Sequence, residues 1–230
     1  MLTLAIDTAS DRCAVALWRD GATGALLGER EHAMARGHGE ALFGMVEALL
    51  TRCAVKPAGI SRFAAIRGPG TFTGLRIGLA AARGLALALN AEAVGITAFQ
   101  LVAGEDLERT GERASRIVAI DARRGEIYVC VLGPDLEPLA APSVATPQQA
   151  AAVVGDGPDL VIGSGAAALA EAALSAGRRL RTRAVARPAP SLLARLAAMC
   201  DPATSPPDPL YVRAPDAKLP RSAPLRALAP

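Results

Sequence analysis

The sequence predicts an α/β protein of two lobes, each opening with antiparallel strands and continuing with alternating helices and strands. The apolar run 4–7 (LAID) matches 118–121 (VAID), and the strand-like run 13–18 falls on 127–132 at the same offset. Helical patterns follow the strands in both halves. With 230 residues, 51% of them apolar, the chain is long enough to bury a core in each lobe.

The first lobe is predicted to begin with three strands and then to alternate helices with strands. Its first helix carries one broad apolar stripe, and Pro57 and Gly59 close the segment after it. In chain order the predicted elements are strands at 4–7, 13–18 and 25–33, a helix at 39–53, a strand at 62–67, a helix at 73–89, a strand at 93–96 and a helix at 98–107.

The second lobe repeats this order after the polar stretch 104–115. A turn at 133–135 leads toward apolar residues 136–140 in the place of the third strand. Pro147 begins one predicted helix, and Pro188 and Pro190 precede the last one. The remaining elements are a helix at 147–154, a strand at 159–163, a helix at 166–176 and a late helix at 191–200.

Antiparallel strands followed by strand–helix alternation, used twice, are typical of the actin-like ATPase (ASKHA) fold, a duplicated ribonuclease-H-like unit. We therefore expect an N-terminal lobe at 1–106 and a C-terminal lobe at 107–213. The remaining residues, 214–230, are predicted to be a flexible, proline-rich basic tail.

Several classes of protein are disfavoured by composition. No uncharged apolar run approaches the roughly 18 residues of a membrane span, and the amino terminus lacks the basic start of a signal peptide, so we expect a cytoplasmic protein. His32 and His38 are six apart, which does not suit two metal ligands on one helical face, and no metal is expected. The cysteines have no C-x-x-C pair and are expected to be reduced. They are Cys13, Cys53, Cys130 and Cys200.

Positive charge is unevenly distributed, although the net charge is only +3. Five arginines between 178 and 187 cluster without an acid, and the segment from Arg213 onward is basic. Such patches can contact RNA phosphates, but we expect a solvated surface first, because aromatic residues make up only 3% of the chain. The arginines are Arg178, Arg179, Arg181, Arg183 and Arg187.

The segment 68–78 (GPGTFTGLRIG) joins a predicted strand to a long helix through a glycine-rich loop. Thr71 or Thr73 can cap the first amides of this helix, which makes the loop a candidate anion seat. Its spacing fits neither a Walker A loop nor a dinucleotide fingerprint, so an ordinary strand-to-helix turn is the favoured interpretation. No cofactor is assigned to this chain, and the candidates for binding one are Asp7, Gly70 and Thr71.

Four segments together resemble the TsaB (YeaZ) family: 4–9 (LAIDTA), 68–78, 121–128 (DARRGEIY) and 209–213 (PLYVR). The resemblance implies an actin-like fold and a non-catalytic partner subunit that scaffolds or activates the transferase TsaD. The pair, with the ATPase TsaE, would form N6-threonylcarbamoyladenosine at position 37 of ANN-decoding tRNAs. It also implies a homodimer when TsaD is absent, ATP or ADP bound at the interface with TsaD, and tRNA contacted through the complex.

This mapping assigns a partner surface to the two long helices of the first lobe, with Phe43, Val46 and Leu50 assigned instead to the intramolecular core. No catalytic residue is assigned, and the metal-binding H-x-x-x-H of the paralogue is absent, because Leu42 stands fourth after His38. The predicted partner-surface residues are Leu42, Met45, Leu49, Gly74, Gly78, Ala81 and Ala82.

Two further interpretations remain open. The chain could be an ATP-dependent kinase or phosphotransferase of the same fold, with Asp7 and Asp121 near the phosphates and 163–165 (GSG) beside the adenosine. Its weakness is that residues 8–12 lack the glycine of a phosphate-binding hairpin. At 121–128 a tight turn is favoured, and the alternative is that Arg123 and Arg124 face the cleft or an RNA phosphate.

Overall fold

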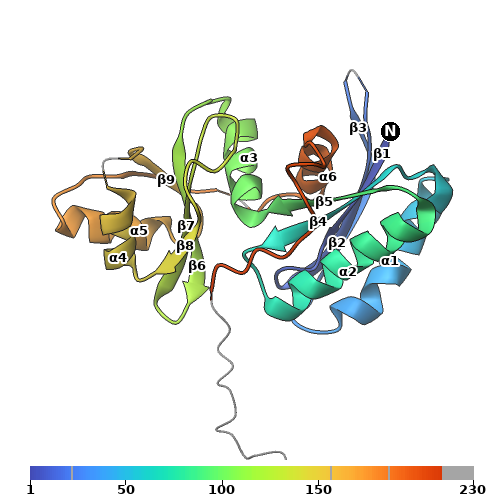
Figure 1. Ribbon diagram of the computed structural model, residues 1–230, viewed down its shortest axis with the longest axis horizontal. Helices are drawn as coiled ribbons and strands as arrows, with labels where there is room; N and C mark the ends of the chain where they lie inside the picture. Colours follow the sequence, from blue (N-terminus) through green and yellow to red (C-terminus); the bar gives the residue numbers. More distant parts are fainter. Residues whose placement is uncertain (22, 156, 186, 214–230) are drawn as a thin grey trace, which may run out of the picture.

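Two five-stranded sheets lie side by side in the computed structural model, which describes residues 1–21, 23–155, 157–185 and 187–213 (Figure 1). The strand orders are β3-β2-β1-β4-β5 in the first sheet and β10-β9-β6-β7-β8 in the second. Each sheet has three antiparallel strands, joined to two parallel ones. The predicted duplication is therefore confirmed, with β1 and β6 as equivalent central strands.

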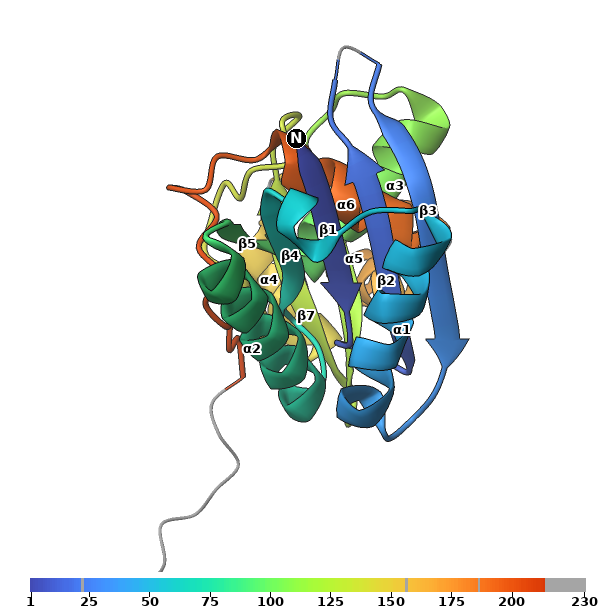
Figure 2. The same ribbon diagram turned by 90° about the vertical axis from the view of Figure 1, so that its right-hand side faces the viewer.

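The first sheet has helices on both faces (Figure 2). One face packs on α1 and α2, and the other on α6. Side chains along β1 alternate accordingly, since Leu4 and Ile6 lie in the first core and Ala5 in the second. The elements are β1 (Leu2–Asp7), β2 (Arg12–Arg19), β3 (Ala25–Ala33), α1 (His38–Arg52), the short 3₁₀ helix Pro57–Gly59, β4 (Arg62–Gly68), α2 (Phe72–Leu89), β5 (Glu92–Thr97) and α6 (Pro190–Met199).

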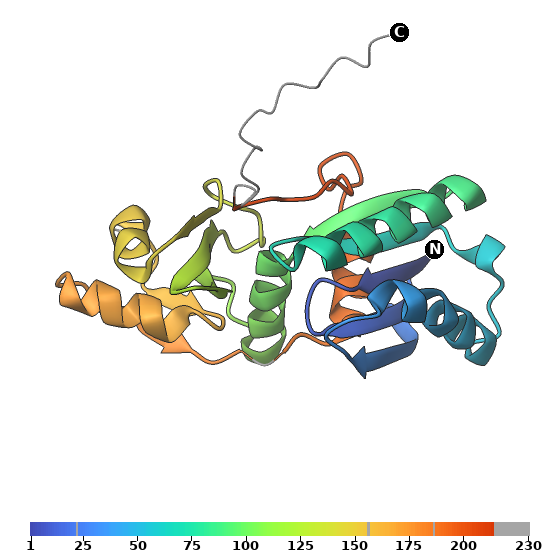
Figure 3. The same cartoon turned by 90° about the horizontal axis from the view of Figure 1, so that it is seen from below.

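The second sheet is covered by α4 and α5 on one face and by α3 on the other. Helix α3 stands between the two lobes and contacts strands of both sheets (Figure 3). The third strand is β8, which lies beyond the predicted 136–140. The elements are α3 (Ala98–Thr110), β6 (Arg116–Arg123), β7 (Glu126–Leu132), β8 (Ser143–Ala145), α4 (Pro147–Val154), β9 (Leu160–Ile162), α5 (Ala166–Ser175) and β10 (Arg181–Arg183).

The end of the chain does not stay in the second lobe as the boundary 107–213 predicts. Helix α6 packs on the first sheet, where the Arg62 guanidinium donates to the carbonyls of Ala198 and Cys200 at the end of the helix. Residues 205–213, here called the C-terminal strap, then follow the first lobe through a hydrogen bond from the Leu210 amide to the Arg67 carbonyl, 2.7 Å. Residues 214–230, the predicted tail, lie outside the described residues.

Helix α2 is the one helix among the described residues that is long and apolar enough to cross a membrane, with a mean hydropathy of 1.4. In this fold it packs against β4 and β5, and 39% of it is buried. Part of its apolar character therefore builds the core, and another part remains on the surface.

Candidate functional site

Other parts of the chain's own backbone occupy the space beside the glycine-rich segment between β4 and α2. A Cβ atom at Gly74 would lie 1.9 Å from the Thr8 carbonyl oxygen, and the Thr8 hydroxyl donates to the Gly74 carbonyl at 2.7 Å. Gly68 has φ of 136°, and a Cβ there would lie 2.5 Å from the Leu210 carbonyl oxygen of the C-terminal strap. These glycines allow three segments to pack closely, so a ligand is not needed to explain them.

The start of α2 is capped from within. The Gly74 amide donates to the Thr71 hydroxyl at 3.3 Å, so the predicted cap is confirmed at Thr71. The Thr71 amide in turn donates to the Ala9 carbonyl at 2.8 Å. A Cβ at Gly70 would also meet Ala9, at 2.9 Å from its Cβ. The candidate cofactor residues Gly70 and Thr71 therefore hold the β1–β2 loop against α2.

Asp7, the third candidate for cofactor binding, is buried and fully engaged. Its carboxylate accepts the Arg12 Nε at 2.7 Å and the Ala9 amide at 3.0 Å. Arg12 is also buried and donates to Glu31 at 3.0 Å and to the Pro188 carbonyl at 2.9 Å. The Arg12 guanidinium thus occupies the space at the carboxyl end of β1, beside Asp7. No group of three potential metal ligands occurs among the described residues.

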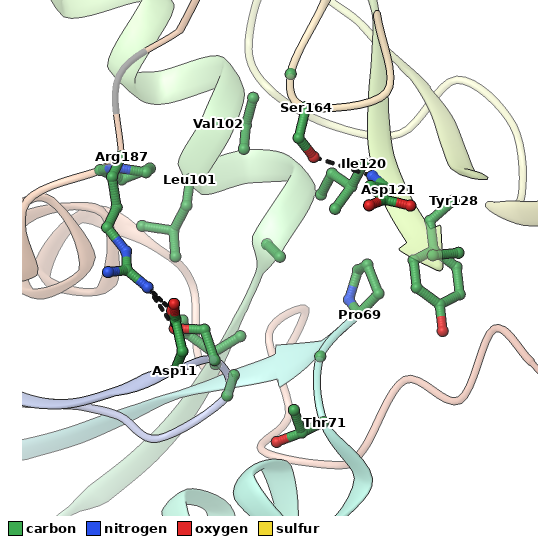
Figure 4. A pocket seen from close by; sticks show the side chains of 18 of the residues that line it. Asp11, Pro69, Thr71, Leu101, Val102, Ile120, Asp121, Tyr128, Ser164 and Arg187 are labelled. Atoms are coloured by element: carbon green, nitrogen blue, oxygen red, sulfur yellow. Dashed lines mark hydrogen bonds and ion pairs between the residues drawn. The ribbon is translucent and has the colours of Figure 1, made fainter. Parts of the chain in front are cut away.

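A cleft of about 750 Å³ separates the two lobes (Figure 4). It brings together Asp7 and Asp121 with Ser164, the residues that the kinase interpretation requires. Each of these has an internal partner: the Ser164 hydroxyl, for example, accepts the Asp121 amide at 2.9 Å. Arg187 pairs with Asp11 across the rim of the same cleft. Most polar side chains that line the cleft therefore already have hydrogen-bond or ion-pair partners within the protein.

Cys13 lies in the core near this end of the first sheet. Burial, reinforced by the nearby Asp7 carboxylate, raises the pKa of the Cys13 thiol to about 11. Burial likewise raises the pKa of Cys130 to about 11. Both thiols are protonated at neutral pH, so neither offers a thiolate nucleophile.

The predicted partner-surface residues lie in the core and do not form an exposed face. On α1, Leu42 and Leu49 are fully buried and Met45 is 4% exposed. On α2, Ala82 is fully buried and Ala81 is 8% exposed. The two remaining positions, Gly74 and Gly78, are buried where the helix passes the β1–β2 loop.

For α1, the prediction placed buried residues on the partner surface and one exposed residue in the core. Val46 and Leu50 lie in the core, as expected, but Phe43 is 56% exposed. On α2, small residues can mark either a partner contact or a close intramolecular approach. Here the backbone of Thr8 takes up that space, which the sequence pattern alone does not reveal.

A different apolar surface does face outward on these helices. We call it the α1–α2 face and define it by exposed apolar residues of both helices, beside which the charged residues Glu47 and Arg83 are also exposed. Leu87 is 86% exposed at its end, and Cβ atoms at Gly44 and Gly84 would meet no atom within 4 Å. The α1–α2 face consists of Phe43, Gly44, Ala80, Gly84, Leu87 and Ala88.

Carboxylates lie beside several arginines of the cluster between 178 and 187. Arg183, on β10, pairs with buried Asp106 at 2.9 Å and with Glu112. Arg181 pairs with Asp159 at 2.8 Å, and Arg187 with Asp11 as described. Carboxylates from distant parts of the sequence therefore neutralise three of the five arginines, which favours a structural role for the cluster over the expected solvated surface and over RNA contact.

Comparisons with known proteins agree with this fold and with the resemblance to the TsaB (YeaZ) family. The family model described as "TsaD: tRNA N6-adenosine threonylcarbamoyltransferase" matches residues 31–161. TsaB of Escherichia coli is 40% identical over 129 residues, which are 56% of this chain and 53% of that protein. The match thus spans about half the length of this curated relative. An uncharacterized protein of Mycobacterium bovis is 34% identical over 215 residues, 94% of this chain and 93% of its own length.

Solved structures give the same result. A Pseudomonas aeruginosa protein described as similar to peptidase YEAZ superposes with a TM-score of 0.70 at 25% identity, covering 92% of this chain and 99% of its own. A ROK hexokinase from Thermus thermophilus superposes with a TM-score of 0.52 at 14% identity, covering 86% and 98%. The second likeness concerns the fold alone. It shows that a hexokinase has a similar fold, as expected for the predicted actin-like class.

Proposed function

We propose that this chain, which belongs to the TsaB (YeaZ) family, is the non-catalytic partner subunit of a TsaD-type transferase. In this role it docks on the transferase and orders its active centre during synthesis of threonylcarbamoyladenosine in tRNA. We propose the cytoplasm as its location. The observation that supports the proposal is the α1–α2 face, an exposed apolar surface on two neighbouring helices. In the central cleft, by contrast, the polar side chains hydrogen-bond mostly to other groups of the chain.

The cleft supports a non-catalytic role. Phosphate binding in this fold calls for an open backbone hairpin after the first strand, whereas Arg12 and Asp7 form a buried ion pair at that place. Building a phosphate site would require this pair to separate, and a buried charge without its partner costs several kcal/mol, about 3–5. The kinase alternative is therefore not favoured by the geometry.

The α1–α2 face has the properties of a helix-pairing surface. Contiguous exposed apolar residues are uncommon on monomers and usually mark interfaces. Gly44 and Gly84 leave room for another backbone to come close, while Phe43 and Leu87 provide large side chains to bury. Two helices from each partner would form a four-helix contact. This surface replaces the buried residues that the sequence interpretation nominated.

The same face serves two partners in our proposal. It would pair with TsaD in the working complex, and with a second copy of this chain when TsaD is absent. The ATPase TsaE would join this complex, ATP or ADP would bind at the junction with TsaD, and tRNA would be contacted by the assembly.

The test is a charge placed on the α1–α2 face. Ala80→Glu puts a carboxylate at the centre of the exposed side of α2, and Ala168→Glu makes the same change at an exposed site on α5. We expect Ala80→Glu to abolish co-elution with TsaD and threonylcarbamoyl transfer by the TsaD–TsaE mixture, while Ala168→Glu leaves both unchanged. Circular dichroism checks that each variant is folded. Co-elution of Ala80→Glu with TsaD at the parental level would refute the assignment.

A further inference from the structure

A stack of aromatic rings and guanidinium groups lies on the surface where the C-terminal strap passes the start of α2. The rings of Phe72 and Tyr211 have centroids 5.4 Å apart and are inclined by 32°. The Arg76 guanidinium lies over the Phe72 ring at 3.8 Å, and its Nε donates to the Tyr211 hydroxyl at 3.1 Å. Both rings remain accessible, with Phe72 53% and Tyr211 44% exposed.

A second pair of a ring and a guanidinium group lies two residues further along the strap, where it meets the second lobe. The Arg213 guanidinium lies 5.6 Å from the centre of the Tyr128 ring, and its Nη2 donates to the Ala122 carbonyl at 3.1 Å. Arg213 also pairs with Glu126. Two groups of rings and guanidinium groups therefore lie along the strap, one at the start of α2 and one on the second lobe. We call this set, Phe72, Arg76, Tyr128, Tyr211 and Arg213, the aromatic–arginine band.

This gathering is notable because the chain has only seven aromatic residues. Among the described residues, three rings count as exposed: Phe43 on the α1–α2 face, and Phe72 and Tyr211 in the band. The band also carries net positive charge, since no carboxylate in the described part of the chain pairs with Arg76. The adjacent β6–β7 turn adds Arg123.

We propose that the aromatic–arginine band binds single-stranded RNA. Unpaired bases stack on aromatic rings and on guanidinium planes, and the cationic groups attract the phosphates between them. A double helix does not offer its base faces, so the band would prefer unpaired nucleotides. The proposal deepens the proposed function, on which it rests, by assigning to this subunit a direct contact with the RNA substrate.

Binding is measured with the full chain and a fluorescent single-stranded oligoribonucleotide of about 12 nucleotides, a length within the range that single-strand-binding folds cover. Phe72→Leu removes the ring and keeps a helix-forming apolar residue, and Phe43→Leu makes the same change outside the band. We expect Phe72→Leu to weaken binding by about tenfold, the loss typical of one stacked base, and Phe43→Leu to leave it unchanged. Arg76→Gln should weaken binding and lower its salt dependence.

Three results would overturn the proposal. One is equal weakening by Phe72→Leu and Phe43→Leu, and another is no saturable binding at about 100 µM chain, the weak limit of non-specific binding. The third is a Phe72→Leu variant that keeps RNA binding but loses TsaD, which makes the band a protein contact. Ala80→Glu separates the two proposals, because it should abolish pairing with TsaD while the isolated chain still binds RNA.

Discussion

Replacing Gly74 by Ala tests whether the glycine-rich segment is a packing device. The same change at Gly84, ten residues along the same helix, is the matched control. At Gly84 the new methyl group meets no atom within 4 Å. There, Ala should stabilise the protein by about 0.5–1 kcal/mol, because Gly costs that much in a helix interior.

At Gly74 the new Cβ would lie 1.9 Å from the Thr8 carbonyl oxygen, so the two must separate by about 1 Å to reach the 3.0 Å that real Cβ contacts respect. Overpacking of this kind costs about 1–3 kcal/mol. The displacement also strains the hydrogen bond from the Thr8 hydroxyl, worth about 1 kcal/mol. After the gain in helix propensity, Gly74→Ala should destabilise by about 1–3 kcal/mol.

Urea denaturation followed by circular dichroism measures both free energies of unfolding, and the two variants should differ by about 2–4 kcal/mol with opposite signs. The parental slope with denaturant should be kept, because neither change alters the area exposed on unfolding. Equal stabilisation by both substitutions would refute the reasoning, since it would mean that α2 and the β1–β2 loop are not in fixed contact.

Two further predictions concern ion pairs near the junction of the lobes. Asp106→Asn should destabilise the fold by about 3–5 kcal/mol, because it leaves fully buried Arg116 without its carboxylate, whereas Asp159→Asn, at an exposed pair, should leave the free energy of unfolding almost unchanged in the same urea titration. A hydrogen bond from Arg183 lowers the pKa of Glu112 below its ordinary 4.5. The stabilisation of the folded state by this pair is therefore present above pH 4.5 and is lost as the pH falls through the lowered pKa. The melting temperatures of the parent and Glu112→Gln should therefore differ at neutral pH and converge in acid, and a gap that persists in acid would contradict this cause.

The succession of strands and helices along the chain was accessible from the sequence because it depends on local patterns. Alternating apolar residues, turns rich in Gly and Pro, and the Thr71 cap all act within a few residues of one another. The duplicated LAID and VAID runs then predicted two similar sheets. The proposed partner face was not accessible in this way, because α2 is apolar on most of its circumference and periodicity cannot say which side is buried.

Long-range pairings account for the other differences. The acids that neutralise Arg181 and Arg183 come from positions 22 to 77 residues away, so a cluster in the sequence is not a cluster of free charge in space. The return of α6 to the first sheet is of the same kind. Its signal was the run of small residues Ala5, Ala16 and Ala64 on one face of that sheet, which leaves room for a helix but does not say which one.

The return of α6 has a consequence for how the molecule is made. A ribosome that has synthesised the first hundred residues has produced every strand of the first sheet, but not the helix that covers one of its faces. That face must wait, exposed, until Pro190–Met199 emerges after the whole second lobe. The first lobe therefore completes its core only after the second lobe has been synthesised, and a fragment of residues 1–106 would lack the helix that covers one face of its sheet.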